Sequence, residues 1–364
     1  VAVVASTLEI CTGPGDGSTG LGQIFAQEGM KTAVVILNWN GEEMLRQFLG
    51  GVVDSVPTGV EVIVADNGST DSSCRYVEEH HPAVRLIRLD RNYGFAEGYN
   101  RALAHLDDYD CYVLLNSDVQ TPKGWLEPLI ERLESDVTIA AVGPKILSVE
   151  EPDKFEYAGA AGGFIDVLGY PFCRGRILST IEQDQGQYDT KREVFWASGA
   201  AFCCRAELFR RAGGFDADFF AHMEEIDLCW RMQLMGYKIM VEPRSVVYHL
   251  GGGTLPNDSP RKLYLNYRNN LAMLFKCAPT WQRCIVAIAR PLADALSAIV
   301  YLVKGQRELT KAVWQAYKEF FLAHKELGKK RRAVRSSVKQ ESQTIYRGSI
   351  VLRYALGRKR FEKM

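Results

Sequence analysis

The sequence lacks a regular cysteine framework. Its nine cysteines are an odd number, they include the adjacent Cys203 and Cys204, and none forms a C-x-x-C pair. This pattern argues against a zinc site and against a small secreted scaffold held together by disulfides. It favours reduced thiols, so we expect a cytoplasmic protein.

Long apolar runs are also scarce. A bilayer-spanning helix needs about 20 apolar residues, and the nearest candidate, residues 284–303, contains Arg290 and Asp294. We therefore expect no membrane-spanning helix. Residues 1–29 lack the basic region of a secretory signal, and Met30 resembles a natural start, so the opening segment is interpreted as a leader of unknown status.

Net charge is absent from the chain as a whole, but its two parts differ strongly. The 364 residues contain 44 Lys+Arg and 44 Asp+Glu. Residues 1–260 carry a formal charge of −17, and residues 261–364 carry +17. A basic C-terminal part suggests an anionic partner, and either a membrane surface or nucleic acid would fit. The 47% of hydrophobic residues can fill a large core, which excludes a disordered chain.

From residue 30 onward, short β-branched runs alternate with helix-like segments. The expected strands are 33–37, 60–65, 84–89 and 111–115, and the expected helices lie near 42–52, 71–80, 95–105 and 124–135. This alternation is typical of βαβ units. It predicts an α/β fold with a mostly parallel sheet flanked by helices.

Each expected strand ends in polar residues. The polar segments are 38–40, 66–71, 92–95 and 116–118. Because parallel strands place their carboxyl ends at one edge, we expect these segments to meet at one crevice, where open α/β sheets bind ligands. Asp66 taken alone would suit a turn or a helix cap equally well. Asp118 follows the most apolar strand, where a carboxylate is costly without a cation, so it is the best candidate for a metal ligand.

Three carboxylates stand within four positions ahead of a helix-like run. They are Glu224, Glu225 and Asp227. Like charges at this range raise one another's pKa, so such a cluster indicates a cation, hydrogen bonds or a chemical task. Asp227 stands four residues before Arg231, which favours an ion pair along one helix face. Glu225 has no such partner and is the stronger candidate for chemistry.

Six motifs in a fixed order carry a family resemblance. They are "VVILNWNG", "VIVADNGSTD", "NYGFAEGYN", "LLNSDVQTPKGWL", "ASGAAFCCR" and "MEEIDLCWRMQLMGY". Together they resemble the family 2 glycosyltransferases of GT-A fold, in particular the rhamnosyltransferase-like branch. The resemblance implies a catalytic domain over residues 30–275. An amphipathic helical extension over 276–327 and a basic tail over 328–364 would follow.

The resemblance implies roles for residues on the donor side. Asp66 matches the aspartate that hydrogen-bonds the nucleobase, and Asn38 lies in the first nucleotide-contacting loop. The other residues expected on this side are Asn40, Asn67, Asn92, Gly94, Asn116, Ser117 and Arg268. Residues 116–118 match the DxD motif, with Asp118 as ligand of a divalent cation, Mg²⁺ or Mn²⁺, and His249 near the metal and diphosphate. Asn replaces the first Asp of the motif, so weaker metal binding is expected.

The same resemblance implies that Glu225 is the general base. In the family the second residue of a Glu-Asp pair has this role, and here the pair is Glu224-Glu225. Glu224 is expected on the acceptor side with Trp196, Ser198 and Gly199, although Trp196 is equally well explained as a core aromatic. The implied reaction is an inverting transfer from a nucleotide-diphosphate sugar, such as dTDP-L-rhamnose or a UDP-hexose. The implied acceptor is a hydroxyl of a glycan or lipid-linked molecule in cell-surface polysaccharide synthesis.

The C-terminal segment has helical periodicity and a basic cluster. Apolar residues recur at helical spacing from 279 to 327, and six Lys/Arg stand between 325 and 335. These features predict peripheral attachment to the inner face of a membrane. Packing on the catalytic domain and an oligomer interface stay open. Aromatic-rich helices without a nucleic-acid-binding fold argue against nucleic acid.

Two alternatives remain for the function. A nucleotidyltransferase would share the α/β crevice, but it should show a Gly-rich basic signature after the first strand, where this chain has "NWNGEEM". A non-catalytic sugar- or lipid-binding protein of the same fold would need no base. Turnover of a nucleotide sugar that depends on Glu225 would separate an enzyme from this second alternative.

Overall fold

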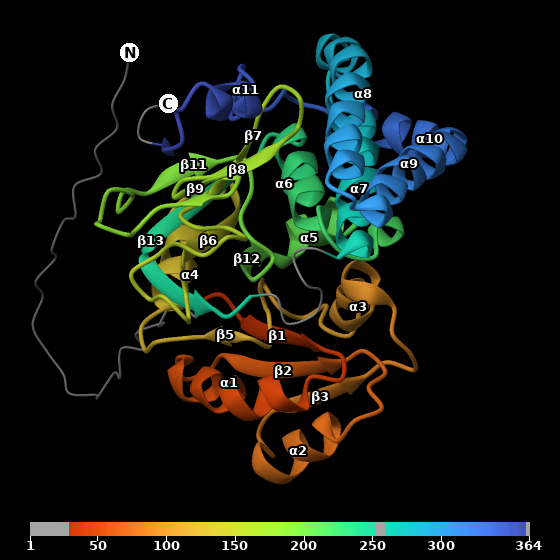
Figure 1. Cartoon of the computed structure of the whole chain (residues 1–364). Helices are drawn as coiled ribbons and strands as arrows, with labels where there is room; N and C mark the ends of the chain where they lie inside the picture. The colour runs from red at the N-terminus through yellow and green to blue at the C-terminus, as the bar shows by residue number, and fades with distance from the viewer. Residues whose placement is uncertain (1–28, 252–258, 362–364) are drawn as a thin grey trace, which may run out of the picture.

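A mixed sheet forms the centre of the protein. The computed structural model describes residues 29–251 and 259–361, so the expected leader falls almost wholly outside the described residues. The strand order is β11-β13-β6-β12-β4-β1-β2-β3, with β5 paired to β13 (Figure 1). The strands are β1 (Thr32–Asn38), β2 (Glu61–Asp66), β3 (Arg85–Arg88), β4 (Cys111–Leu115), β5 (Val119–Gln120), β6 (Ile139–Ser148), β11 (Arg192–Val194), β12 (Ala201–Arg205) and β13 (Lys238–His249).

The N-terminal half of this sheet is parallel. β1 pairs with β2 and β4, and β2 pairs with β3, all in parallel. The register sets Asn38 opposite Asp66, so two of the expected polar strand ends meet. β12 runs antiparallel to both β4 and β6, and β11 and β5 run antiparallel to β13. The four predicted strands and the βαβ alternation are confirmed, and the antiparallel members lie outside that predicted set.

Helices cover the two faces of the sheet. One face packs on α1 (Glu42–Ser55), α2 (Ser73–His80) and α4 (Glu127–Glu134). The opposite face packs on α3 (Gly94–Leu103), α5 (Ala206–Arg211), α6 (Glu224–Leu234) and α7 (Pro260–Cys277). A small second sheet contains β7 (Gly163–Ile165), β8 (Pro171–Cys173), β9 (Arg176–Ile177) and β10 (Thr180–Ile181). The predicted sheet with flanking helices is confirmed.

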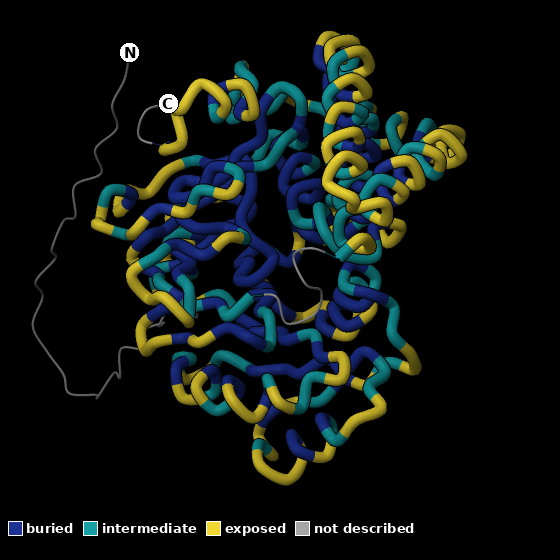
Figure 2. The backbone as a smooth tube through the Cα atoms, in the orientation of Figure 1, coloured by how far each residue is buried: buried dark blue, intermediate teal, exposed yellow. Residues whose placement is uncertain are grey.

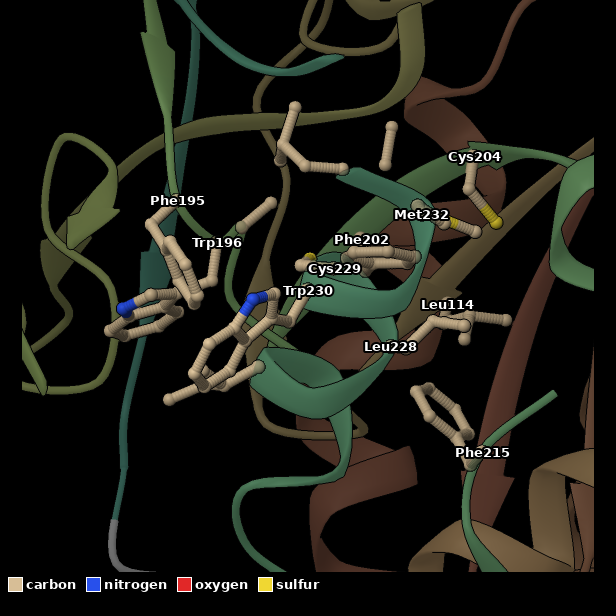
Figure 3. Close-up of a cluster of buried hydrophobic side chains, with 14 of the residues drawn as sticks. Leu114, Phe195, Trp196, Phe202, Cys204, Phe215, Leu228, Cys229, Trp230 and Met232 are labelled. Atoms are coloured by element: carbon tan, nitrogen blue, oxygen red, sulfur yellow. The ribbon is translucent and has the colours of Figure 1, made fainter. Parts of the chain in front are cut away.

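Helix α6 is anchored by its large side chains. Figure 3 shows the helix residues Leu228, Cys229, Trp230 and Met232 beside the sheet residues Leu114 and Phe202. Trp230 is fully buried. A buried side chain of this kind contributes about 1.5–3 kcal/mol to stability. This packing fixes the position of the first turn of α6, which carries Glu224 and Glu225.

The expected helical extension over 276–327 contains α8 (Thr280–Val303), α9 (Arg307–Leu322) and the start of α10 (His324–Ser336). The rest of α10 and α11 (Ile350–Ala355) fall in the expected tail. In Figure 1, α8, α9 and α10 lie beside α7, away from the central sheet. Residues 338–361 return to the catalytic domain: Lys339 N–H donates to the Leu234 carbonyl, and Phe361 packs against the ring of Phe164. The described part of the segment expected as a separate tail over 328–364, residues 328–361, is therefore packed on the domain.

Part of the basic cluster has internal partners. Lys330 contacts Asp216 at 2.5 Å and Asp218 at 2.6 Å. Arg331 donates to the last carbonyls of α7, where a cation is also favoured by the helix dipole. Arg335 donates to the Cys277 carbonyl. Three of the six basic side chains thus hold α10 on the catalytic domain. This corrects the expectation that the whole basic cluster faces an anionic surface.

Helix α8 corrects the expectation that no segment is long and apolar enough to cross a membrane. It is a helix long and apolar enough to cross a membrane, judged by length and composition alone, and 22% of its most apolar window is buried. The prediction counted Arg290 and Asp294 as interruptions of the apolar run. The two side chains are instead buried and paired with each other, with Arg290 Nε 3.2 Å from Asp294 Oδ2. The helix therefore has a polar buried side and an apolar exposed side.

We expect Lys276→Met to destabilise the fold by about 3 kcal/mol, because two buried carboxylates each lose one of their two cationic partners. Lys276 is 2% exposed, and its Nζ contacts both Asp216 and Asp227, the latter at 2.9 Å. Urea unfolding would measure the loss. Lys311→Met is the control: Lys311 pairs with Glu308 on the surface, and its loss should cost less than about 1 kcal/mol. Equal losses in both variants would contradict this interpretation.

Candidate active site

The expected donor-side residues of β1 and β2 lie at the carboxyl edge of the sheet. Asn38 Nδ2 donates to Asp66 Oδ1 at 3.0 Å and to Ser73 Oγ at 2.9 Å. Both Asn38 and Asp66 are buried, and Asn38 Oδ1 has no hydrogen-bond partner within the described parts of the chain. Asn40 is exposed, with φ of 49°, and its Oδ1 accepts from Thr70 N–H at 2.7 Å. The structure therefore brings Asn38, Asn40 and Asp66 together.

Asn67 and Asn92 brace the loop ahead of α3. Asn67 Nδ2 donates to Asn92 Oδ1 and to the Gly94 carbonyl, and its Oδ1 accepts from the Tyr93 N–H. Asn67 is 2% exposed. Gly94 has φ of 77°, and a Cβ there would meet the ring of Phe220 at 2.5 Å. These three residues were expected to contact the nucleotide sugar. In the structure they shape the loop instead, because the polar groups of Asn67 and Asn92 bond within it and the Phe220 ring packs against Gly94.

Asp118 and His249 meet at the same edge. β5 pairs with the end of β13, which sets His249 opposite Val119. His249 Nε2 lies 3.2 Å from Asp118 Oδ1, and His249 Nδ1 lies 3.5 Å from Glu156 Oε2. Burial opposes the charge on His249, but its contacts with the two carboxylates raise its pKa to about 10. Burial alone would raise the pKa of Asp118, yet the contact with His249 lowers it, so the carboxylate is ionised.

The residues of the DxD-like segment fit a shared cation. In the described parts of the chain, no three His, Cys, Asp or Glu side chains are arranged to hold a metal ion. Mg²⁺ and Mn²⁺ commonly use one or two protein carboxylates and take further oxygens from a diphosphate. Asp118 is ionised, and Asn116 Nδ2 lies 3.4 Å from His249 Nε2. The site thus fits a cation held jointly with a bound diphosphate. The middle residue of this segment, Ser117, faces the loop after β1, because a Cβ at Gly41 would lie 3.9 Å from Ser117 Oγ.

The two glutamates at the start of α6 have different surroundings. Glu224 is 5% exposed, and burial together with the charge of Glu225 raises its pKa well above the usual range. It faces inward, which corrects its expected place on the acceptor side. Glu225 is half-buried, and burial raises its pKa to about 7. Its Oε2 has no hydrogen-bond partner among the described groups. A carboxylate with this pKa suits proton transfer near neutral pH.

The segment before α6, residues 218–223, is strained and firmly held; we name it the base loop. Phe220, His222 and Met223 have φ of 64°, 70° and 70°. Such values cost non-glycine residues about 1–3 kcal/mol each unless surrounding contacts impose them. Asn269 Nδ2 donates to three carbonyls of the base loop, those of residues 219, 221 and 222, at 2.8–2.9 Å. The base loop therefore positions Glu225.

Arg268 also holds the base loop, and together with Asn269 it forms what we name the clamp. Its Nη2 donates to the carbonyls of Asp218 and Phe219, and its Nε donates to Asn269 Oδ1. The guanidinium is thus engaged with backbone, which corrects its expected contact with a phosphate. The Phe220 carbonyl accepts from the N–H groups of Phe95 and Ala96 at the start of α3. The base loop is therefore tied to both α7 and the donor-side loop.

We expect Asn269→Ala to lower kcat by about 10–100-fold with little change in donor affinity, because small misplacements of a reacting group are costly. The loss of three hydrogen bonds would release the base loop while leaving the donor-side edge intact. Steady-state kinetics would separate kcat from KM. Asn266→Ala is the matched control on α7, since Asn266 donates within the helix to the Lys262 carbonyl. A similar loss in the control, or no loss in Asn269→Ala, would contradict the clamp.

The expected acceptor-side residues divide into two groups. Trp196 is 3% exposed, and its Nε1 donates to the Phe164 carbonyl at 3.1 Å, so it is a core residue and not an acceptor contact. Ser198 Oγ donates to the Ala158 carbonyl at 2.6 Å. A Cβ at Gly199 would lie 3.8 Å from Cβ and Cγ of Glu225. Of these residues, Gly199 is the one that faces the candidate base.

A single turn connects the two halves of the site. Asn116 N–H donates to the Ala200 carbonyl at 3.0 Å, and the adjacent Gly199 faces Glu225. Asp118 stands two residues after Asn116. The DxD-like segment and the candidate base therefore flank the same turn before β12.

Sequence analysis did not identify three residues of this region. They are Glu156, which contacts His249, Asn269, which holds the base loop, and Lys262, whose charge interacts with Glu156. Glu156 lies in an irregular segment without periodicity. Arg268 is among the residues expected on the donor side, and its neighbour Asn269 makes the more numerous contacts with the base loop.

Comparisons with known proteins agree with this geometry. Residues 33–211 match the family model described as glycosyl transferase family 2. An N-acetylglucosaminyl-diphospho-decaprenol L-rhamnosyltransferase of Mycobacterium tuberculosis is 27% identical over 267 residues, which cover 69% of this chain and 86% of the relative. A pre-mycofactocin glycosyltransferase of the same organism is 30% identical over 204 residues, which cover 52% of this chain and 37% of the relative.

A solved structure has the same fold. The crystal structure of GalNAc-T7 with UDP, GalNAc and Mn²⁺ matches with a TM-score of 0.59 and 16% identity, over 73% of this chain and 51% of that chain. At this identity the likeness concerns the fold alone, and the chain spans about half of that protein. The expected GT-A fold is confirmed.

Proposed function

We propose that this chain, which belongs to glycosyl transferase family 2, transfers a sugar from a nucleotide-diphosphate donor to an acceptor hydroxyl, with Glu225 as the general base. One observation carries the proposal: Asn116, two residues before the ionised Asp118, bonds to the same turn whose Gly199 faces the half-buried Glu225. Neither of the alternatives from the sequence needs a second carboxylate there. Metal-held diphosphate and proton removal are the two tasks of an inverting transfer.

The residues of the site divide these tasks. Asn38 and Asp66 form the polar floor proposed for the nucleobase and ribose. Asn38 Oδ1, which has no partner among the residues that the structure describes, would be one acceptor. Asp118 would hold a divalent cation that stabilises the charge on the departing diphosphate, and His249 would join it as a ligand only after losing its proton. Glu225 takes the proton of the acceptor hydroxyl as that oxygen attacks the anomeric carbon. The new glycosidic bond forms as the bond to the diphosphate breaks, and the anomeric configuration inverts.

The donor and acceptor follow from the relatives by analogy. The relative with 86% coverage is named as a rhamnosyltransferase acting on a diphospho-decaprenol lipid. We therefore propose an L-rhamnose or hexose donor linked to dTDP or UDP, and a lipid-linked or glycan acceptor in polysaccharide synthesis. The reaction would take place in the cytoplasm, at the inner face of the membrane.

We expect kcat to rise with pH and to level off above about pH 7, because only the ionised carboxylate of Glu225 accepts a proton. Burial raises the pKa of this group to about 7, so each pH unit below that value should cost about tenfold in rate. A profile of kcat between about pH 5 and about pH 9 would test this, because the ionisation of Glu225 falls in the middle of that range. A rate independent of pH would contradict the role of Glu225.

The function itself is tested by a donor screen. Thermal unfolding with a panel of nucleotide sugars, each with and without Mn²⁺, should show one donor that raises Tm, because a ligand that binds only the folded state stabilises it. With acceptor present, that donor should release a nucleoside diphosphate. Release of pyrophosphate from a nucleoside triphosphate would favour a nucleotidyltransferase. Binding without turnover would favour a sugar-binding protein.

A further inference from the structure

Helix α8 exposes a continuous apolar stripe. Six side chains at intervals of three or four residues share one helix face and are 42–82% exposed: Ile285, Ile288, Leu292, Leu296, Ile299 and Val303. We name this set the α8 stripe. Figure 2 colours residues along the length of α8 as exposed. Soluble proteins rarely leave apolar patches of this extent uncovered, so the stripe indicates a contact surface.

The opposite face of α8 is fastened to the catalytic domain by polar contacts. Arg290 Nη1 donates to the Leu168 carbonyl at 2.9 Å and to Asn270 Oδ1 at 2.8 Å. Asp294 accepts from the hydroxyls of Tyr170 and Tyr317. A helix that crossed a bilayer would lose these contacts and carry Arg290 and Asp294 into lipid, at high cost. The geometry therefore favours a helix that lies along a membrane surface over one that crosses it.

Charge distinguishes a membrane from a second copy of the chain. Residues 261–364 carry a formal charge of +17, so two copies that met through α8 would bring like charges together. Lys304 and Arg307 follow directly on the end of α8, and both are exposed. Anionic lipid headgroups attract such bases by about 1 kcal/mol each near the surface. The apolar α8 stripe and the basic side chains that follow it are together complementary to an anionic lipid surface.

We propose that the α8 stripe seats the protein in the plane of an anionic membrane, with the stripe among the acyl chains and the polar face of α8 on the catalytic domain. The helix is about 36 Å long at 1.5 Å per residue over its 24 residues. This seat would hold the catalytic domain beside a lipid-linked acceptor, a consequence that rests on the proposed function. The membrane contact itself does not.

The experiment measures binding of the full chain to vesicles. Sedimentation with phosphatidylcholine vesicles, with and without phosphatidylglycerol, should show binding that the anionic lipid strengthens. The double variant Ile288→Ser/Leu292→Ser should lose about tenfold or more in affinity, since it removes exposed apolar surface without touching the core. The control Val137→Ser/Leu352→Ser changes residues that are 75% and 62% exposed elsewhere, and it should bind as wild type does.

Other outcomes would overturn the proposal. If the protein did not bind vesicles, or if the Ile288→Ser/Leu292→Ser variant (the stripe variant) bound them as well as wild type, the α8 stripe would not be a membrane-binding surface. Retention on vesicles after extraction with alkaline carbonate would indicate a helix that spans the bilayer. A dimer in sedimentation velocity that the stripe variant abolishes, without vesicle binding, would assign the stripe to a second copy. The Glu225→Gln protein should bind vesicles as wild type does, so failure of the transferase chemistry would be seen separately.

Discussion

Glu225→Gln should lower kcat by about 10²–10⁴-fold while donor affinity stays close to that of wild type. Gln keeps the size of the side chain and removes the group that accepts the proton. Glu225 is half-buried beside Gly199, and its pKa is raised to about 7 by burial, so the fold gains nothing from its charge that Gln would forfeit. Single-turnover kinetics and donor titration would measure the two quantities separately.

The adjacent Glu224 provides a matched control. Burial and the neighbouring carboxylate raise its pKa well above the usual range, so its neutral form is favoured. Glu224→Gln keeps the size of this inward-facing side chain and should leave kcat within a few-fold of wild type. A large loss in Glu224→Gln with a small one in Glu225→Gln would reverse the assignment of the base.

Asp118→Asn should lower kcat by about a hundredfold or more, because stabilisation of the leaving diphosphate is worth several kcal/mol. The ionised carboxylate lies 3.2 Å from His249 and is the one carboxylate of the DxD-like segment. The variant should also need a higher Mn²⁺ concentration for half-maximal rate. A titration of the rate with Mn²⁺ would measure both effects.

Asp108→Asn is the control for this charge. Its side chain is 67% exposed and pairs with Lys31 on the surface, so its loss should change neither the rate nor the metal requirement. If Asp118→Asn retained the wild-type rate at every Mn²⁺ concentration, the DxD-like segment would have no part in catalysis. The Asn at position 116 would then explain a metal-independent enzyme.

Regular periodicity made the fold predictable. The alternation of apolar runs and helical segments between residues 30 and 135 predicted four parallel strands and their helices, and the polar strand ends of that set do meet at one edge. The ion pair of Asp227 and Arg231 also follows from spacing alone, and their contact at 2.8 Å confirms it. These features depend on residues close together in the chain.

Long-range contacts were the part that the sequence did not reveal. Asn269 acts on a loop about fifty residues earlier, and Glu156 meets a histidine from the far end of β13, so neither has a local signature. Trp196 was placed near an acceptor because of its motif, whereas its surroundings make it part of the core. Arg290 and Asp294 looked like breaks in an apolar run, but their mutual pairing removes them from the exposed face of α8.

The most direct test is a crystal structure of the Glu225→Gln protein with Mn²⁺ and the intact donor found in the screen. The expected result has the cation at Asp118 between protein and diphosphate, and the anomeric carbon of the sugar facing the side chain at position 225. A donor bound elsewhere, or one whose anomeric carbon points away from position 225, would contradict a shared site for Asp118 and Glu225.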